Sequence, residues 1–381
     1  MPGTYRRVDL DVARTVLVFA VVVFHGLRVF DPFDFYVKGP EIDALAPVIL
    51  LGGLIGMPLF FVLAGVSLWH SMGRRSPAAL ARERVRRLGV PFAVAVVVLV
   101  PPQIHVERLQ DGTAGTYWDT LRDFFDVRLT THFPIPVDGQ GTSPFEPAHA
   151  WFLAYLLVFT LALLPVLWPL RRDARRGAAL ARRIGGRAGL LAAMLAVALV
   201  ESAHAAEDAG GWSRWVYPLF LVFGFLLAAD PSAGRTLVAL RRRLAFVAAT
   251  AFVLLTATAG ALHDRLGDAM LTGHDAEAMA WRAGQGLTGC LLLGAVLGWL
   301  GARREASRSR AGGPVLAWAR TVALPVYLVH QTVGVVCAYV VLRAGMPVGL
   351  ARWSRSSPRR PPSRSSSPRR SAARRSAPRS A

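Results

Sequence analysis

The chain has 381 residues, of which 53% are hydrophobic, and its mean hydropathy is +0.39. Many of its apolar runs approach the ~20 helical residues that cross a hydrocarbon core, so the composition indicates a membrane protein with several spans. Cys290 and Cys337 each lie inside an apolar run, which argues against a disulfide framework or a thiolate metal site. The formal net charge of +20 could suggest nucleic acid, but in a membrane chain the position of each arginine matters more than the sum, and no nucleic-acid partner is expected.

Nine apolar segments have the composition of membrane-spanning helices. In chain order they are residues 10–30, 47–69, 88–102, 151–169, 188–203, 215–229, 244–262, 283–301 and 322–342. They predict an all-α fold, a polytopic transmembrane helix bundle with no separate soluble domain.

The connections between these segments alternate in charge. Acidic or mixed connections are residues 31–46, 103–150, 204–214 and 263–282. Arginine-rich connections are residues 70–87, 170–187, 230–243 and 302–321. Because positively charged loops favour the cytoplasm, we expect a multi-pass protein of the cell membrane with a cytoplasmic N-terminus. The long connection from Gln103 to Ala148 then lies outside, and its Pro- and Gly-rich part predicts irregular structure.

The first segment contains two polar residues in "RTVLVFAVVVFHG", Arg14 to Gly26. His25 follows Arg14 by eleven residues, about 16 Å along a helix and about 20° around its axis, so both side chains project from one face. Since an ionisable group in lipid costs about 2.5 to 3.5 kcal/mol, both should face the bundle interior or a wet cavity. Taken separately, Arg14 could reach the headgroups or pair with Asp11, and His25 could bridge two helices. Their shared stripe favours a functional site.

Further short motifs follow this segment in order. They are "PLFFVLAGVSLW" (58–69), "RERVRRLGVP" (82–91), "HAWFLAYLLVF" (149–159) and "YLVHQ" (327–331). Together with the Arg-x10-His arrangement after "YRRVDLDVA", this pattern resembles the acyltransferase-3 family of integral membrane acyltransferases. Ala64 stands where the family's second-helix motif usually has serine. The resemblance covers about residues 5 to 345 and is nearest to glucan-modifying members similar to glucan biosynthesis protein C.

The resemblance implies transfer of an acyl group from cytoplasmic acyl-CoA to a hydroxyl of a carbohydrate or lipid-linked acceptor. Acyl-CoA is then a donor substrate, and no cofactor or metal is expected. A histidine titrates near neutral pH, so His25 is the candidate base that takes the hydroxyl proton as attack on the thioester begins, although it could instead carry the acyl group transiently. Arg14 would hold an anionic or carbonyl part of the donor through its planar, permanently charged fork.

Five other residues complete the predicted site. Arg84 and Arg87 would lie at the cytoplasmic mouth beside the phosphates of CoA, although topological charge is the simpler explanation for either one. His149 and Trp151 would bind the acceptor at the outer end of the fourth segment; the alternative for His149 is an interfacial residue of an aromatic belt. His330 is either a second polar group of the active cavity or a hydrogen-bond partner between helices, and the sequence slightly favours the second.

Two other functional classes compete with an acyltransferase. A membrane transporter with an intramembrane Arg and His pathway would also use such residues, but it usually shows discontinuous spans in corresponding halves, which the sequence lacks. An anchored module could bind nucleic acid or anionic lipid through its basic tail, yet only Trp353 could supply stacking there. The sequence also contains no P-loop, HExxH or GxSxG motif.

The end of the chain differs from the rest in composition. We assign residues 5–345 to one membrane acyltransferase domain and residues 351–381 to a disordered tail rich in Arg, Ser and Pro. This tail holds ten arginines and no acid, and nine spans would leave it outside, against the positive-inside bias. The family resemblance implies a tenth span here. We therefore expect either a native tail that binds anionic polymers or a frameshifted coding sequence whose neighbouring frame encodes about 20 apolar residues.

Overall fold

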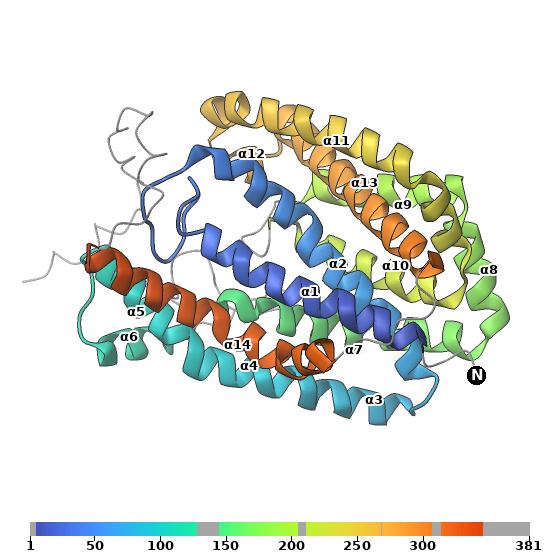
Figure 1. Ribbon diagram of the computed structural model, residues 1–381, viewed down its shortest axis with the longest axis horizontal. Helices are drawn as coiled ribbons and strands as arrows, with labels where there is room; N and C mark the ends of the chain where they lie inside the picture. Colours follow the sequence, from blue (N-terminus) through green and yellow to red (C-terminus); the bar gives the residue numbers. More distant parts are fainter. Residues whose placement is uncertain (1–4, 128–144, 205–210, 268, 307–313, 346–381) are drawn as a thin grey trace, which may run out of the picture. The chain divides into compact units, whose positions relative to one another are not determined.

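The computed structural model describes residues 5–127, 145–204, 211–267, 269–306 and 314–345. Over these residues every regular element is helical, which confirms the predicted all-α membrane bundle (Figure 1). The α-helices are α1 (Tyr5–Leu27), α2 (Ala46–Met72), α3 (Pro77–Arg84), α4 (Val90–Val94), α5 (Val100–Gln110), α6 (Tyr117–Phe124), α7 (Trp151–Arg172), α8 (Ala174–Gly185), α9 (Arg187–Ala203), α10 (Tyr217–Ala229), α11 (Ser232–Leu266), α12 (Ala269–Thr272), α13 (Ala276–Ala306) and α14 (Pro314–Arg343). Short 3-10 or π segments are η1 (Asp43–Leu45), η2 (Val85–Gly89), η3 (Ala95–Leu99), η4 (Ala148–Ala150) and η5 (Arg214–Val216). The C-terminal tail lies outside the described residues.

Each of the nine predicted spans falls in a helix, but not all of them are long enough to cross a membrane alone. In the described part of the chain, six helical stretches meet that requirement: residues 43–72, 77–110, 148–172, 232–266, 276–303 and 321–343. Helices α8 and α9 meet at 81° and add a seventh span if they are counted as one. The apolar parts of α1 and α10, residues 12–27 and 214–229, are shorter. Residues 214–229 match the predicted span 215–229, and the whole of α1, Tyr5–Leu27, has 23 residues.

The third span is longer than its two prolines suggested. The span was predicted over residues 88–102, ending at the second of two prolines, but the helical stretch runs from Pro77 to Gln110. Segments η2 and η3 are π-helical turns within it, and both prolines lie in the first turn of α5 directly after η3. A proline is tolerated there because its missing N–H is not needed for that turn. The chain therefore continues as a helix through both prolines.

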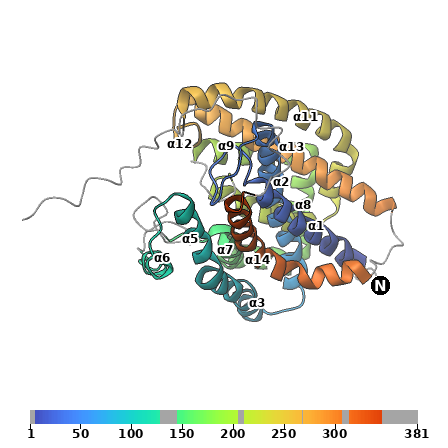
Figure 2. The same cartoon turned by 60° about the vertical axis from the view of Figure 1, so that its left-hand side comes forward.

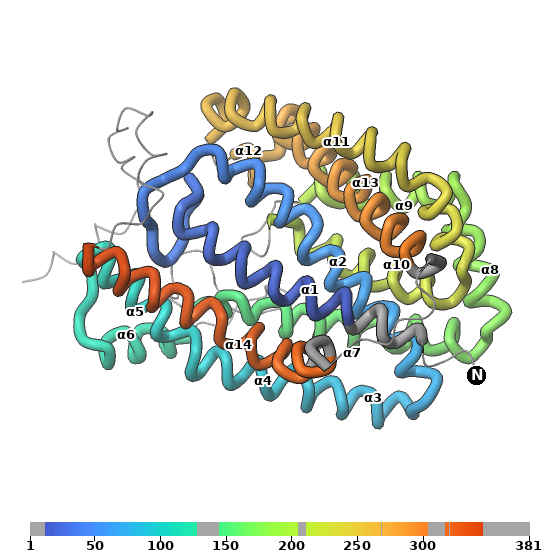
Figure 3. Tube along the Cα trace, in the orientation of Figure 1, coloured from blue at the N-terminus to red at the C-terminus, as the bar shows by residue number. Residues whose placement is uncertain are grey.

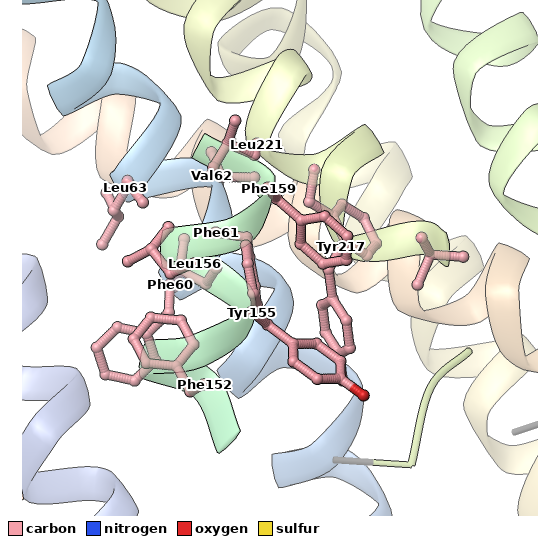
Figure 4. Packing of buried hydrophobic residues seen from close by; sticks show 14 of the residues in the cluster. Phe60, Phe61, Val62, Leu63, Phe152, Tyr155, Leu156, Phe159, Tyr217 and Leu221 are labelled. Carbon is pink, nitrogen blue, oxygen red and sulfur yellow. The ribbon is translucent and has the colours of Figure 1, made fainter. Parts of the chain in front are cut away.

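Helix α2 packs against α10 at the centre of the molecule. Phe61 of α2 stacks on Tyr217 of α10 with ring centroids 4.7 Å apart, and both rings are buried (Figure 4). Gly65 and Gly224 lie where the two backbones cross: a Cβ atom on Gly65 would collide with the carbonyl of Leu221, and one on Gly224 with the α2 backbone. Small residues allow this close approach in membrane bundles. Gly65, the glycine of the motif at residues 58–69, is thus required by the packing of α2 against α10.

Helix α1 lies between α2 and α14 and contacts both (Figure 3). Figure 2 shows α14 bending along its course, and Pro325 lies inside this helix, as expected for a kink. The start of α1, α3 and α8 lie at one end of the bundle, while α5, α6 and α12 lie at the other (Figure 1). We call these the arginine-rich end and the acidic end, after the connections that each contains. Helix α1 therefore runs beside α14 from the arginine-rich end toward the acidic end.

The connection predicted between residues 103 and 148 is partly helical. Helix α5 continues to Gln110, and α6 follows with a capping box in which the Thr116 side chain accepts from the Asp119 N–H while the Asp119 side chain accepts from the Thr116 N–H. This box stabilises the first turn of α6 and was overlooked in the sequence. Most of the Pro- and Gly-rich stretch lies outside the described residues.

Candidate active site

Arg14 and His25 lie on one stripe of α1 that faces the bundle interior. Val18 and Val21 come between them at helical spacing, and both are buried in the main hydrophobic core. Arg14 donates hydrogen bonds to α2, whereas His25 contacts α14. The stripe therefore runs inside the protein rather than toward lipid.

His25 belongs to a cluster of three histidines contributed by three separate elements. His25 lies near the end of α1, His149 in η4 at the start of α7, and His330 in α14. The His25 Nδ1 and His330 Nε2 atoms are 2.9 Å apart, and the ring centroids of His149 and His330 are 5.2 Å apart. His149 and His330 are only 5% and 8% exposed. The fold thus gathers three imidazoles near the acidic end, and two of them are almost fully buried.

Backbone carbonyls determine which nitrogen of each ring carries the proton. A carbonyl oxygen can only accept, so the nitrogen beside it must be the donor. His25 Nδ1 lies 3.1 Å from the Val21 oxygen, His330 Nδ1 lies 2.7 Å from the Tyr327 oxygen, and His149 Nε2 lies 2.8 Å from the Leu328 oxygen. The neutral rings then keep lone pairs on His25 Nε2, His330 Nε2 and His149 Nδ1.

Within the part of the chain that the structure describes, one of these three lone pairs accepts a hydrogen bond. His330 Nε2 accepts from His25 Nδ1–H. Among the described residues, His25 Nε2 makes no hydrogen bond, and His149 Nδ1 is buried without a partner. Over the same residues, no three His, Cys, Asp or Glu side chains are arranged to hold a metal ion. The arrangement therefore offers two imidazole lone pairs that can accept a proton or a hydrogen bond from a bound molecule.

A buried amide network attaches the His330 helix to the third span. Gln331 Nε2 donates to Gln103 Oε1 at 2.9 Å, and Gln103 Nε2 donates to Thr332 Oγ1 at 2.8 Å. The Thr332 hydroxyl donates in turn to the Leu99 carbonyl at 2.7 Å. Gln103 and Thr332 were missed in the sequence. The consecutive polar residues His330, Gln331 and Thr332 within an apolar span were the available signal.

The loop after α1 covers the histidine cluster at the acidic end. The Phe35 ring stacks on His25 with centroids 6.2 Å apart and planes tilted by 23°. Asp31 is fully buried and forms ion pairs with Arg28 at 2.6 Å and Lys38 at 2.9 Å. Sequence reasoning placed Asp31 in an acidic or mixed connection and did not foresee that two cations would surround it. These pairs hold the loop against the site.

Two of the predicted arginines meet at the arginine-rich end. Arg14 Nη2 donates to the Leu63 carbonyl at 2.8 Å and to the Ser67 hydroxyl, and Arg84 Nη2 lies 3.5 Å from the Ser71 hydroxyl, one turn further along α2. Arg84 lies within electrostatic range of Arg14, and its Nε is buried without a hydrogen-bond partner. Like charges brought together inside a protein are stabilised by an anion between them.

Arg87 and Trp151 do not join these groups. The Arg87 side chain is 68% exposed and pairs with Glu83 one turn earlier at 3.2 Å. The Trp151 ring packs on Tyr155 and Tyr217 with centroids 5.1 and 5.3 Å away. Trp151 therefore belongs to the aromatic core beside the histidine cluster, and no contact between its ring and the three histidines occurs among the described residues.

A second buried polar cluster lies between α9 and α13. Arg282 and Glu201 are both fully buried. Arg282 donates to the carbonyls of Glu201 and Ser202 at 3.2 and 2.9 Å, and the Glu201 carboxylate accepts from the Ser213 N–H at 3.1 Å. Neither side chain keeps an unpartnered buried atom within the described residues. This cluster attaches the segment before α10 and offers nothing to a ligand, unlike the histidine cluster.

Comparison with protein-family models gives a match to the model described as an acyltransferase domain, over residues 7–356. The matched region includes α1, η4 and α14, so it contains all three histidines and both arginines at the opposite end. No curated protein and no solved structure matches the chain.

Proposed function

The chain belongs to the acyltransferase-3 family of membrane acyltransferases, and on this premise we propose that it moves an acyl group from acyl-CoA to a hydroxyl of a carbohydrate or lipid-linked acceptor. One observation carries the proposal. Arg14 and His25 lie on a single interior stripe of α1, and a buried polar atom without a hydrogen bond among the described residues lies near each end of it, Arg84 Nε at one and His149 Nδ1 at the other. Unpaired buried polar atoms are costly, so a site of this kind is built for a ligand that supplies the missing partners.

The arginine pair suits the nucleotide end of the donor. Arg14 and Arg84 present permanently charged groups, and the buried Arg84 Nε has an unused N–H that a phosphate oxygen can accept. CoA carries its phosphates and its thioester at opposite ends of a long, flexible arm. His25 lies about 16 Å from Arg14 along α1, so a donor held by its phosphates at the arginines extends its thioester toward the histidines.

His25 Nε2 is the proposed base. It takes the proton of the acceptor hydroxyl while the hydroxyl oxygen attacks the thioester carbonyl. A C–O bond forms, the C–S bond breaks, and the CoA thiolate leaves with the proton that His25 had taken. The products are the acylated acceptor and free CoA, and His25 returns to its neutral form. No resident cofactor or metal is required for this sequence.

His149 is the proposed contact for the acceptor. Its Nδ1 lone pair is buried without a partner among the described residues, and its ring lies 5.2 Å from that of His330. A second hydroxyl of a carbohydrate can donate to it while the reacting hydroxyl meets His25. This favours a polyhydroxy acceptor, in line with the resemblance to glucan-modifying family members.

The charge distribution supports an orientation in the cell membrane. The arginine-rich end carries the positive connections, so we place it and the N-terminus in the cytoplasm, where acyl-CoA is found. The test uses a variant in which alanine replaces both native cysteines, Cys290 and Cys337. Single cysteines are then placed at Trp118 in α6 and at Arg176 in α8, whose side chains are 75% and 84% exposed. An impermeant thiol reagent added to intact cells should label position 118 and not position 176, and the reverse pattern contradicts the orientation.

The activity itself is tested with purified protein in liposomes. The protein is given acetyl-CoA, or a longer acyl-CoA, with a glucan oligosaccharide, and release of free thiol is followed. Thiol release should need the acceptor and should fall about 10²- to 10⁴-fold in His25→Ala, because general-base loss has that effect. His204→Ala, at an exposed histidine after α9, is the matched control and should retain the rate. A membrane transporter would release no thiol with either protein.

A further inference from the structure

The hydrogen bond between His25 and His330 joins residues 305 positions apart in the sequence. The Tyr327 carbonyl, 2.7 Å from His330 Nδ1, requires a proton on that nitrogen and therefore leaves the His330 Nε2 lone pair directed at His25. The Val21 carbonyl is also near His25 Nδ1, at 3.1 Å, but in an α-helix this oxygen already accepts the backbone N–H four residues later. His330 thus supplies the acceptor that is not shared with the helix.

We infer that His330 is a positioning residue for acyl transfer: by accepting the Nδ1–H of His25, it keeps the lone pair of His25 on Nε2 and fixes the plane of the ring. This inference rests on the proposed function, in which His25 Nε2 is the base. It assigns His330 a role through another side chain instead of contact with the substrate. In general, a histidine acts as a base only through the nitrogen that carries the lone pair, and the hydrogen bond made by the other nitrogen determines which one that is.

The proton movements are consistent with this role. When His25 Nε2 takes the hydroxyl proton, the ring becomes an imidazolium whose Nδ1–H is a stronger donor. His330 Nε2 already accepts that hydrogen, so the pair needs no rearrangement as charge develops. When the thiolate recovers the proton from Nε2, the original hydrogen bond remains. His330 neither gains nor loses a proton overall.

The surroundings of His330 hold it in place from two sides. On one side, Gln331 and Thr332 bind Gln103 and Leu99 of the third span. On the other side, the Tyr327 hydroxyl donates to the His149 carbonyl at 2.6 Å. A residue that orients another must itself be held, and these bonds set the register of α14 against η4 and α5.

The experiment compares variants of the full-length protein in liposomes, with the thiol-release assay. His330→Leu and His330→Phe remove the accepting nitrogen, and His330→Phe also keeps the ring volume. His330→Gln retains an accepting oxygen. Gln285→Leu is the matched control, because it removes a buried hydrogen bond to the Gly211 carbonyl from α13, outside the network that holds His330.

The inference predicts that His330→Leu and His330→Phe lower kcat about 10- to 100-fold with an unchanged KM for acyl-CoA. His330→Gln should recover most of kcat, and His330→Leu should add no further loss to His25→Ala, since both act through one base. Any small loss in Gln285→Leu should add to that of His25→Ala, because Gln285 lies outside this network. A normal kcat in His330→Leu, equal impairment in His330→Gln, or a change confined to KM overturns the inference.

Two results separate this inference from the proposed function. If His25→Ala transfers at the normal rate, the assigned base is wrong and both proposals fail. If His25→Ala is inactive and His330→Leu is normal, only the positioning role fails. Solid-state nitrogen NMR of the unaltered protein, with the His25 ring assigned by its loss in His25→Ala, gives a test that needs no folded His330 variant. It should find the proton on His25 Nδ1, and a proton on Nε2 at neutral pH contradicts the inference.

Discussion

Replacing Gln103 with leucine should lower the free energy of unfolding by about 2 kcal/mol. Gln103 is fully buried, and its side-chain amide exchanges two hydrogen bonds with α14, one donated to Thr332 and one accepted from Gln331. Hydrogen bonds between membrane helices average about 0.6 kcal/mol each, so the two together contribute about 1 kcal/mol. The substitution also leaves the buried Gln331 amide without its acceptor, which costs about 1 kcal/mol or more.

The measurement is reversible unfolding in mixed micelles as the denaturing detergent is increased, for Gln103→Leu, Gln331→Leu and the double variant. The double variant should be less destabilised than the sum of the single ones, because it leaves no unpaired amide at the contact. The Thr332 hydroxyl keeps its bond to the Leu99 carbonyl in all three proteins. Stability equal to wild type in Gln103→Leu, or strict additivity in the double variant, would refute this account of how α14 is attached.

Three further predictions test other parts of the structure. Gly65→Val should prevent α2 and α10 from packing and sharply lower the yield of folded protein on size exclusion, whereas Gly334→Ala, where a Cβ atom meets nothing within 4 Å, should fold normally. Arg14→Lys keeps the positive charge but loses the planar guanidinium that can make two parallel hydrogen bonds, so it should raise the KM for acyl-CoA. An unchanged dependence of the rate on acyl-CoA concentration would make Arg14 a structural residue. The hydrogen bond from the Thr116 hydroxyl lowers the pKa of Asp119 below its ordinary value, so the cap should be fully formed above about pH 4 and lost as the pH falls further. Amide exchange in α6 should follow that pH dependence, and Asp119→Asn should abolish it.

Much of the fold could be predicted from local sequence because membrane helices satisfy their own backbone. An apolar run of sufficient length has few alternatives in lipid, which is why each of the nine predicted segments lies in a helix. The end of the third span was predicted wrongly at its prolines. Whether Pro101 and Pro102 break the helix depends on the π-helical turn before them, and that turn has no clear sequence signature. Likewise, the bend between α8 and α9 is not evident in composition.

The two ends of the candidate site differ in how far sequence could predict them. The spacing of Arg14 and His25 is a property of one helix, so helical periodicity alone places them on one stripe. The contact of His25 with His330 depends on how α1 packs against α14, which one sequence does not reveal. Tertiary packing also decides that Arg84 is partly buried near Arg14, with its Nε atom fully buried, while Arg87, three residues later, is exposed and pairs with Glu83. Identical residue types in one motif thus differ in role because of their surroundings.

The most direct test of the central claim is the ester content of the cell envelope. Glycans and lipids are analysed by mass spectrometry from cells that carry the wild-type chain or His25→Ala at equal levels in the membrane, before and after mild alkali. We predict an alkali-labile acyl group on a carbohydrate or lipid-linked hydroxyl that is present with the wild-type chain and absent with His25→Ala. Equal amounts of that ester with both proteins would contradict the claim that His25 is the base of an acyl-transfer reaction.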